Sequence, residues 1–386
     1  MTILFWVLLF LILFCYLAYP ASVYLLARFK PNPVITCPIE PSVSVVISLY
    51  NEEDVIASKL DNLLRLDYPI DKLEILLGSD GSTDRTHEII SRYSDPRIKL
   101  FINPLRQGKM ATINGLIPKA RNEIIVFTDA RQTFEMNAVR KLVSNFADPH
   151  VGCVSGELMF APKSGGTARG VSLYWNYEKF IRRQESRIHS MMGATGAIYA
   201  IRKKLFVAGP ANIVLDDMYT PFRIIQQGYR AIFDDTAYAY DQVAGNPKEE
   251  HRRKTRTLYG NYQIFSILPG MFNPFKSPIA IQLFSHKFLR VIIPFFLIAL
   301  LAINYLLRSN PFYNIFLFLQ IIFYTMAWIG HLIRDRKERA LKPVSRLCYV
   351  PYVFCLLNFS ALVGFYRFIT ASQQSTWAKA RDTGHA

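Results

Sequence analysis

The stretch VSVVISLYNEE (residues 43–53) decides the fold, because a run typical of a buried strand is followed at once by polar side chains. Three further strands are predicted downstream, over 73–80 (LEILLGSD), 97–102 (RIKLFI) and 123–129 (EIIVFTD). Apolar residues at helical spacing separate them, over 52–66, from THEIISRY onward, and around 109–117. Strands that alternate with helices form βαβ units, so we predict an α/β domain with a mostly parallel sheet.

Polar side chains mark the ends of three of these strands. Asn51-Glu52 follows the first strand, Asp80-Gly81-Ser82 ends the second, and Asp129 ends the fourth. Ligands of parallel sheets bind at the carboxyl ends of the strands, near the point where the strand order reverses. The coincidence of three polar strand ends therefore predicts a ligand site at this edge of the sheet.

The composition of the whole chain points toward lipid. Of its 386 residues, 51% are hydrophobic and only 19% are charged, whereas a soluble protein has about 25% charged residues. The aromatic content, with 28 Phe and 21 Tyr, excludes a disordered chain. The five Cys residues show no CxxC or Cys/His ligand spacing, which argues against a disulfide framework or a structural zinc site.

Four uncharged runs have the length of membrane-spanning helices, which need about 20 apolar residues. They cover 2–27, 291–307, 309–333 and 347–366. The first run lacks the short apolar core and the cleavage site of a signal peptide, so we predict that it is retained. The last run is broken by Pro351 and Gly364, and a re-entrant or interfacial segment is the alternative there.

The basic residues predict how these segments are oriented. The connector RDRKERALKPVSR (334–346) carries six Lys/Arg, whereas the connector near Arg308 carries one. The positive-inside rule places 334–346 and the middle of the chain, 28–290, in the cytoplasm of a protein in the inner or plasma membrane. The net charge of 45 − 29 = +16 fits contact with anionic lipid heads, and no aromatic–basic module predicts a nucleic acid partner.

These patterns divide the chain into five parts. They are an N-terminal transmembrane helix (1–28), a cytoplasmic α/β domain (40–263), interfacial amphipathic helices (264–286), a C-terminal transmembrane region of about three segments (287–370) and a tail (371–386). The interfacial part is predicted because its apolar run is broken by three prolines and a glycine. APKSGGTAR (161–169) is predicted to be a loop within the domain.

Seven short motifs follow one another along the middle of the chain. They are SLYNEE (48–53), GSDGSTD (78–84), QGK (107–109), FTDA (127–130), GATGAIYAIRK (193–203), LDDM (215–218) and RKTRT (253–257). Together they resemble the inverting glycosyltransferase family 2, and within it the membrane-embedded poly-N-acetylglucosamine, hyaluronan and cellulose synthases. The resemblance covers about 43–265. It implies a GT-A domain, a Rossmann-like nucleotide-sugar fold, inserted between transmembrane α-helices.

The resemblance implies a nucleotide-sugar site on the strand-end residues. By resemblance Glu52 faces the uridine of a UDP-sugar and Asp80 recognises the base. The structural alternative for Glu52 is an acid in the first turn of a helix, which it stabilises. The structural alternative for Asp80 is a place in a turn, followed by a helix that Ser82 or Thr83 caps. A lysine that opens a helix opposes the helix dipole, so a phosphate partner accounts for Lys109, with an exposed surface residue as the alternative.

Asp129 ends an apolar strand, where an unpaired carboxylate is costly to bury. The family has Asp-X-Asp at this point, with the acids holding the ribose and a divalent metal on the diphosphate. This chain reads Asp129-Ala130-Arg131, so the second acid is missing and metal ligation depends on Asp129 alone. We still expect Mg²⁺ or Mn²⁺, because hard cations bind through a carboxylate together with substrate phosphates.

Asp216-Asp217 precedes an amphipathic helical stretch, PFRIIQQGYR. By resemblance the second acid of this pair is the general base, and Asp216 supports it. An inverting transfer needs such a carboxylate to take the proton of the acceptor hydroxyl as its oxygen attacks the anomeric carbon. An ordinary pair of helix-capping acids is the alternative.

RKTRT stands where the family has Gln-X-X-Arg-Trp. The arginine that contacts the diphosphate matches Arg256, while Arg253 replaces the Gln and Thr257 replaces the Trp. Loss of the Trp weakens the case for long-chain synthesis, because in processive relatives it belongs to the acceptor site. The basic residues Arg252, Arg253 and Lys254 are expected to serve the donor phosphates. Anchoring to the membrane surface is the alternative for Arg252 and Lys254.

Three residues are candidates for the acceptor side. The helical stretch 170–187 interleaves aromatic and charged residues. Within it Trp175 is a candidate for stacking on an acceptor sugar, with a core aromatic as the alternative. The compact GATG run places Gly193 and Thr195 in the acceptor pocket, although a tight turn accounts for it equally well.

These assignments predict a membrane-bound inverting hexosyltransferase that moves a sugar from a UDP-sugar to a growing polysaccharide. One alternative is transfer of a single sugar to a lipid-linked acceptor. Another is a non-catalytic membrane subunit that keeps the fold as a nucleotide-sugar-binding scaffold, and the missing second acid is its support. The joint presence of Asp80, Asp129, Asp217 and Arg256 argues against the scaffold. A solute transporter is excluded because the spans carry no charged side chains.

Overall fold

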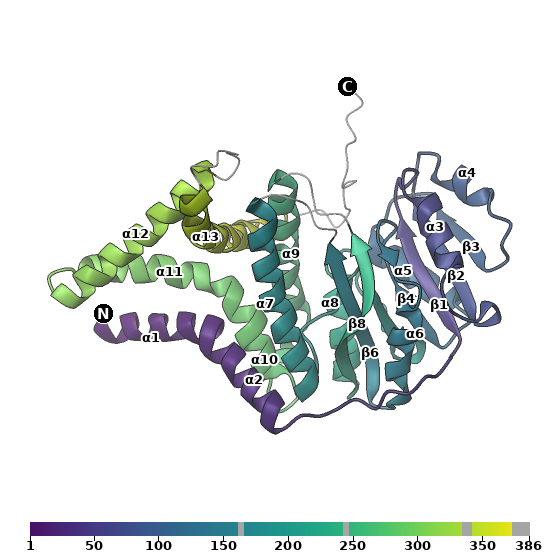
Figure 1. Ribbon diagram of the computed structural model, residues 1–386, viewed down its shortest axis with the longest axis horizontal. Coiled ribbons are helices and arrows are strands. Elements are labelled where there is room, and N and C mark those ends of the chain that lie inside the picture. Colours follow the sequence, from purple (N-terminus) through teal and green to yellow (C-terminus); the bar gives the residue numbers. More distant parts are fainter. Residues whose placement is uncertain (161–165, 242–246, 334–341, 373–386) are drawn as a thin grey trace.

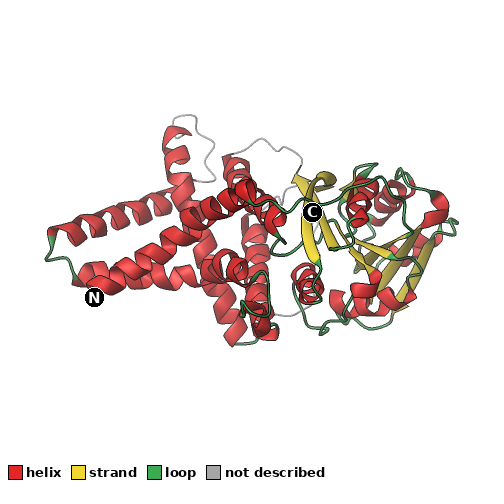
Figure 2. Cartoon of the chain, turned by 90° about the horizontal axis from the view of Figure 1, so that it is seen from below, coloured by secondary structure: helices red, strands yellow, loops and turns green. Residues whose placement is uncertain are grey.

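A sheet flanked by helices forms one end of the molecule, and helices alone form the other end (Figure 1 and Figure 2). The computed structural model describes residues 1–160, 166–241, 247–333 and 342–372. Two long helices, α7 (Gly166–Ile188) and α9 (Pro247–Ile267), stand between the two ends (Figure 1).

Within the described residues, eight strands form the sheet, in the order β3-β2-β1-β4-β7-β6-β8-β5. Their bounds are Val43–Leu49 (β1), Leu73–Asp80 (β2), Ile98–Asn103 (β3), Ile124–Phe127 (β4), Thr133–Phe134 (β5), Val151–Phe160 (β6), Tyr199–Arg202 (β7) and Arg230–Asp241 (β8). The first four strands in this order pair in parallel, as predicted. Their carboxyl ends therefore lie at one edge, and the loops that leave them can meet.

The second half of the sheet is mixed. β7 is antiparallel to both β4 and β6, while β8 is parallel to β6 and antiparallel to β5. The prediction of a mostly parallel sheet is therefore right for the first half and wrong for the second. The β6 and β8 sequences interrupt their apolar residues with Gly, Asp and Thr, so no continuous apolar run marks them as strands.

Helices cover both faces of the sheet, and each face has its own hydrophobic core. α3 (Ile56–Leu64), α4 (Thr86–Ser91) and α6 (Ala138–Ser144) pack on one face, and α5 (Lys109–Leu116) and α8 (Asp216–Gln226) on the other. Alternate residues of β1 enter the two cores: Val45 and Ile47 face the first, and Val46 faces the second.

The remaining helices form the far end of the molecule. α1 (Thr2–Leu13) continues through the π-helical turn η1 (Phe14–Ala18) into α2 (Tyr19–Phe29), and α10 (Ala280–Gln282) continues through η7 (Leu283–Phe288) into α11 (Leu289–Leu306). α12 (Pro311–Ile333) and α13 (Lys342–Ile369) follow. Short 3₁₀ turns are η2 (Ile70–Lys72), η3 (Ile117–Lys119), η4 (Asn145–Ala147), η5 (Lys203–Leu205) and η6 (Pro269–Phe272).

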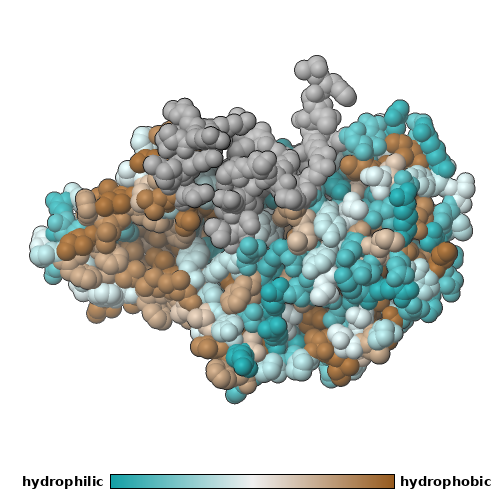
Figure 3. Space-filling model, in the orientation of Figure 1, coloured by the Kyte–Doolittle hydropathy of each residue, from teal (hydrophilic) through white to brown (hydrophobic). Residues whose placement is uncertain are grey.

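Among the described residues, four helices are long and apolar enough to cross a membrane, and each overlaps one of the four predicted runs. They cover Thr2–Phe29, Ala280–Leu306, Pro311–Ile333 and Leu347–Ile369. The second begins at Ala280, inside the stretch predicted to be interfacial. Hydrophobic surface gathers over the projecting helices and is sparse over the sheet end (Figure 3). The last helix is continuous through Pro351 and Gly364, and this glycine lets α13 approach α9 closely, since a Cβ there would lie 3.0 Å from the Tyr259 nitrogen.

Other predictions meet the structure only in part. The loop predicted over 161–169 is wrong for its second half, because α7 begins at Gly166, and residues 161–165 lie outside the described part of the chain. The basic connector at 334–341 and the tail from 373 also lie outside it. The predicted interfacial stretch 264–286 includes the end of α9, η6, α10 and most of η7, and its position in the membrane interface stays a prediction.

Candidate active site

The loops that follow β1 and β2 are tied to each other by hydrogen bonds. The Asn51 side-chain carbonyl accepts a hydrogen bond from the Thr83 backbone N–H at 2.8 Å, and the Ser82 hydroxyl accepts one from the Asn51 N–H at 3.1 Å. The Thr86 hydroxyl accepts from the Glu52 N–H at 2.9 Å. Glu52 therefore lies in a fixed loop ahead of α3, and its alternative as a first-turn acid of that helix is wrong.

The residues predicted to cap the helix after β2, Ser82 or Thr83, are also wrong. α4 begins at Thr86, so Ser82 and Thr83 lie too far upstream to cap it. The Asp84 carboxylate accepts the Thr86 N–H at 3.1 Å instead. The hydroxyls of the SDGSTD motif are thus used to join two strand-end loops, one of which carries Glu52.

Asp80 holds the segment that leads to Lys109. Its carboxylate is fully buried at the end of β2, and it accepts the backbone N–H groups of Gln107 at 2.7 Å and Gly108 at 2.9 Å. Gly108 has a φ of 98°, a conformation that favours glycine. Asp80 therefore fixes the turn from which α5 starts.

Lys109 joins carboxylates that come from two different elements. Its Nζ lies 3.0 Å from Asp129 Oδ1, just beyond β4, and 3.2 Å from Asp216 Oδ2 on α8. Burial would lower the pKa of Lys109, but the carboxylates of Asp129, Asp216 and Asp217 outweigh it and hold this pKa above its usual range. The alternative of an exposed surface lysine is wrong.

The GATG turn wraps around Asp217. The Ala194 N–H donates to the Asp217 backbone carbonyl at 2.7 Å, and the Gly196 N–H donates to Asp217 Oδ2 at 3.0 Å. Gly193 adopts a φ of 99°, which lets the chain turn at this point. The turn thus fixes the orientation of one carboxylate.

Asp217 has the pKa of a workable proton acceptor. Burial, and next the Asp216 carboxylate, raise the pKa of Asp217 from 3.8 to about 6, while Lys109 and the Gly196 N–H act in the opposite direction. A carboxylate with this pKa is ionised at neutral pH and still basic enough to take a proton. Both acids lie in the first turn of α8 rather than before it, where negative charge also favours the helix dipole.

α9 adds a cation to this group of acids. Arg256 is largely buried, and its guanidinium donates to the Val214 carbonyl at 3.5 Å. Burial lowers the pKa of Arg256, and the carboxylates of Asp216, Asp217 and Asp129 offset part of this effect. Arg256 therefore lies within electrostatic range of the same carboxylates as Lys109, but it comes from α9 rather than α5.

The sequence patterns did not single out Lys59, which holds the chain on both sides of Asp129. Its Nζ donates to the Thr128 hydroxyl at 2.9 Å and to the Gln132 carbonyl at 2.6 Å, on either side of Asp129. Burial lowers the pKa of Lys59 to about 7, although Asp129 acts against this effect. A signal was present, because Lys59 shares one helical face with Ile56, Leu60 and Leu63, and these three side chains are fully buried.

The donor set for a metal ion is small. In the part of the chain that the structure describes, no three His, Cys, Asp or Glu side chains are arranged to hold a metal. Asp129 offers one carboxylate, and one of its oxygens is already paired with Lys109. Divalent cations such as Mg²⁺ often bind through one or two carboxylates plus substrate phosphates. The residues therefore fit an ion shared between Asp129 and a bound diphosphate.

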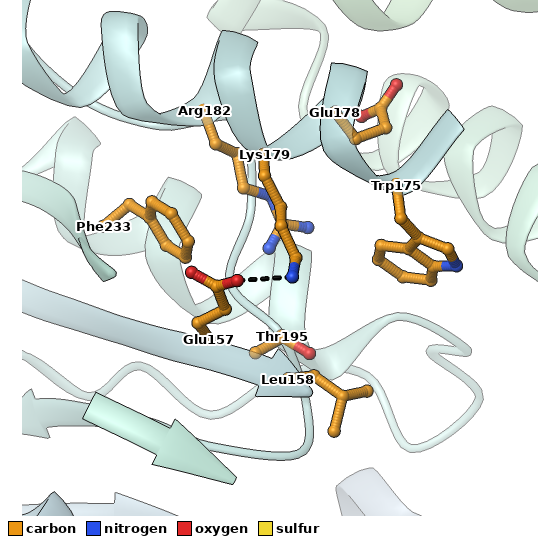
Figure 4. Close-up of a pocket in the computed structure, with 8 residues that line it drawn as sticks. All are labelled: Glu157, Leu158, Trp175, Glu178, Lys179, Arg182, Thr195 and Phe233. Carbon is orange, nitrogen blue, oxygen red and sulfur yellow. Dashed lines mark ion pairs between the residues drawn. The ribbon is translucent and has the colours of Figure 1, made fainter. Parts of the chain in front are cut away.

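Two of the predicted acceptor residues line one small pocket beside the turn that holds Asp217. Trp175 on α7 and Thr195 of the GATG turn line it together with the ion pair between Lys179 and Glu157 (Figure 4). The Trp175 indole N–H is turned away from that ion pair and has no hydrogen-bond partner among the described residues. Gly193 is not among the residues that line the pocket.

The structure thus brings five predicted residues together: Lys109, Asp129, Asp216, Asp217 and Arg256. Glu52, in the loop after β1, and Asp80, at the end of β2, lie at the same edge of the sheet. Arg253 lies one turn before Arg256 on α9, where its carbonyl accepts the Thr257 hydroxyl at 3.0 Å.

Comparison with known proteins gives one family and several relatives. Residues 44–208 match the family model described as glycosyl transferase family 2. The chain is 28% identical over 306 residues to the "Probable glycosyltransferase YdaM" of Bacillus subtilis (strain 168), covering 75% of this chain and 71% of that protein. It is 23% identical over 253 residues to the poly-beta-1,6-N-acetyl-D-glucosamine synthase of Staphylococcus aureus (strain MSSA476), covering 63% of this chain and 60% of that protein.

A solved structure extends the likeness to nearly the whole chain. It is the mannosyltransferase PcManGT from Pyrobaculum calidifontis in complex with GDP-Man and Mn²⁺, with a TM-score of 0.70 and 23% identity, covering 96% of this chain and 100% of that one. At this identity the likeness shows the fold, which is that of a GT-A glycosyltransferase with flanking apolar helices.

Proposed function

We propose that the chain, whose residues 44–208 match the glycosyl transferase family 2 model, is a glycosyltransferase that transfers a hexose from a UDP-sugar to a growing glycan at the membrane. The observation that carries this proposal is the meeting of Asp217, Lys109 and Arg256 at the carboxyl edge of the parallel strands. One proton acceptor and two cations are what an inverting transfer from a nucleoside diphosphate requires.

Asp217 acts as the general base. The acceptor hydroxyl gives its proton to Asp217, its oxygen forms the new bond to the anomeric carbon, and the bond from that carbon to the diphosphate oxygen breaks. The electron pair leaves with the nucleoside diphosphate. Because the Gly196 N–H already holds Asp217 Oδ2, the other oxygen, Oδ1, is the one available to the hydroxyl.

Lys109 and Arg256 stabilise the leaving diphosphate. Lys109 is held between Asp129 and Asp216, and Arg256 of α9 lies within electrostatic range of the same acids, so both cations are in place before the donor binds. Preorganised cations stabilise the charge that develops on the leaving oxygen without further rearrangement. Arg253, one turn away on α9, extends this basic surface toward the phosphates.

Asp129 would hold a divalent cation together with the diphosphate. Such an ion supplies positive charge to the leaving group. The PcManGT neighbour was solved with Mn²⁺, which supports testing Mn²⁺ first and Mg²⁺ second. Glu52 and Asp80 hold the nucleoside end of the donor, Glu52 directly and Asp80 through the turn it fixes.

The acceptor approaches from the side of Trp175 and Thr195, with Gly193 shaping the turn. Four helices of spanning length support a membrane position, and the synthase relative supports a polysaccharide product. The scaffold alternative has little support, since a scaffold has no use for a carboxylate whose pKa is raised to about 6 beside two cations.

The test is release of nucleoside diphosphate by the purified, detergent-solubilised full chain. The donor panel holds several UDP-sugars and GDP-mannose, the sugar nucleotide of the solved neighbour, each with Mn²⁺, Mg²⁺ or EDTA. We expect metal-dependent turnover of one UDP-sugar. Asp217→Asn should abolish transfer and retain donor binding, whereas the matched exposed variant Asp71→Asn should behave as the wild type. Full turnover by Asp217→Asn would overturn the base assignment.

A further inference from the structure

A cavity of about 400 Å³ lies among the helices that join the two ends of the molecule. It is lined by α9, by η7 and α11, and by α13, with Tyr16 and Tyr177 completing the wall. Ligand sites of this size are common in proteins, and they combine mostly apolar walls with a few placed polar groups. Lys254, predicted above to serve the donor phosphates or the membrane surface, lines this cavity, and no step proposed for the transfer uses the cavity.

The walls of the cavity have two different characters. α13 contributes an apolar side that includes Val353, Leu357 and Ala361. The opposite side carries three cations: Lys254 on α9, Lys287 on η7 and Arg290 on α11. Among the lining residues that the structure describes there is no Asp or Glu.

The three cations are held in place around the cavity. Glu178 of α7 is paired with Arg290 and lies 3.8 Å from Lys287, while the Lys254 ammonium lies 5.1 Å from the centre of the Trp175 ring. Arg290 and Lys287 side chains are only 13% and 17% exposed. A second buried carboxylate, Glu185, lies 2.8 Å from His286, so acids as well as cations lie behind the cavity wall. An anion that enters the cavity meets the three cations first, because they line it and the two acids do not.

The apolar side of the cavity belongs to a helix of spanning length. α13 contains the candidate span Leu347–Ile369, and Val350, which lines the cavity, is also exposed on the outside of the helices. A lipid chain can therefore reach the apolar side from the bilayer, while the cations lie toward the sheet domain on η7 and α9.

We propose that this cavity binds the phosphate-bearing head of a lipid carrier, with the phosphate among Lys254, Lys287 and Arg290 and the lipid chain along α13. This inference rests on the proposed function, because the lipid then carries the acceptor sugar to the transferase site. Charge complementarity selects an anionic head, and the apolar wall selects a lipid over free phosphate.

The cavity adjoins the transfer site through Trp175. Lys254 of the cavity packs on Trp175, which lines the small pocket that also contains Thr195. The next residue, Gly196, donates to the Asp217 carboxylate. A sugar attached to a phosphate among the three cations would thus extend past Trp175 toward the general base.

The experiment measures binding of farnesyl phosphate to the full chain in detergent micelles, beside farnesol, inorganic phosphate and an uncharged N-acetylglucosamine oligosaccharide. We expect farnesyl phosphate to bind at least about tenfold more tightly than the other three probes. Lys287→Gln and Lys254→Gln should each weaken it by about tenfold or more. Lys276→Gln, which removes an exposed lysine that does not line the cavity, should leave it unchanged.

A second variant keeps the test independent of the buried charges. Leu357→Trp fills the cavity from α13 and should also weaken farnesyl phosphate binding, with the fold checked by circular dichroism. Equal binding of farnesol, inorganic phosphate or the oligosaccharide would overturn the proposal. Binding by a protein that turns over no donor would overturn the proposed function and retain the lipid site. Turnover with a soluble glycan, without farnesyl phosphate binding, would overturn the lipid site and retain the proposed function.

Discussion

The backbone N–H of Gly196 donates a hydrogen bond to Asp217 Oδ2 across 3.0 Å, and a Cβ at Gly196 would lie 3.2 Å from the same oxygen. Gly196→Ala should therefore displace the carboxylate by a few tenths of an ångström and lower kcat by about tenfold or more, with the donor KM little changed. Steady-state kinetics with the preferred donor measure both quantities.

Gly115→Ala is the matched control for that variant. Gly115 lies near the end of α5, the helix that Lys109 opens, and a Cβ there meets nothing within 4 Å. Because alanine favours the helix, this substitution should keep full activity and stabilise the protein by about 1 kcal/mol at most. Equal kcat for Gly196→Ala and the wild type would contradict the role of this hydrogen bond.

The pH profile of transfer should report the environment of Asp217. The base must be ionised, so kcat should fall as pH drops through about 6, the pKa of Asp217. Lys109 holds that pKa down, and Lys109→Gln should therefore shift the acid limb of the profile to higher pH as well as lower kcat. Lys204→Gln, which removes an exposed lysine of η5, is the control and should leave the midpoint of the acid limb unchanged.

Lys59 should make the stability of the protein depend on pH. Its pKa is lowered to about 7 by burial, so between about pH 7 and 10.5 the unfolded chain holds a proton that the folded chain does not. The unfolding free energy of the wild type should rise with pH across this window. Lys59→Met should lack that rise, which thermal unfolding at pH 7 and pH 9.5 will show.

The same variant tests whether Lys59 positions Asp129. Lys59→Met removes the hydrogen bonds to Thr128 and Gln132, so the donor KM should rise while Lys204→Met stays as the wild type. An unchanged donor KM, with a normal fold, would show that Asp129 is held without Lys59.

Metal use should depend on the single carboxylate of Asp129. We expect EDTA to abolish turnover and Asp129→Asn to raise the concentration of Mn²⁺ needed for half-maximal rate by at least about tenfold. The measurement is a Mn²⁺ titration at saturating donor, with Asp71→Asn as the charge-matched control. Full activity in EDTA would remove the metal from the proposal and leave Lys109 and Arg256 as the cations on the diphosphate.

Cys37 offers a test of orientation in the membrane. It is exposed, in the segment between α2 and β1, whereas the other four cysteines are buried or partly buried. A membrane-impermeant maleimide should label Cys37 only after the cells are permeabilised, if the sheet domain is cytoplasmic. A Cys37→Ser, Ser309→Cys variant moves the exposed thiol to the connector between α11 and α12 and should react in intact cells. The opposite pattern would reverse the orientation.

Local patterns in the sequence were enough for the first half of the sheet and the apolar helices. β1 and β2 are buried on both faces, so each reads as a mostly apolar run, and β4 reads as a continuous one. The polar residues at their ends mark the ligand edge because parallel strands share one carboxyl edge. The strands β6 and β8 were missed because their burial is created by neighbours that are distant in the sequence.

The sequence by itself determined the parallel strands, the apolar helices and the set of acidic and basic residues at the site, because hydrophobic periodicity and motif order are local properties. The tertiary structure decided which carboxylate has its pKa raised by burial, how Lys59 supports Asp129, and that Lys254, Lys287 and Arg290 surround one cavity. These outcomes depend on burial and on short distances between residues far apart in the sequence, such as Lys109 and Asp216 or Trp175 and Lys254, and only packing sets them.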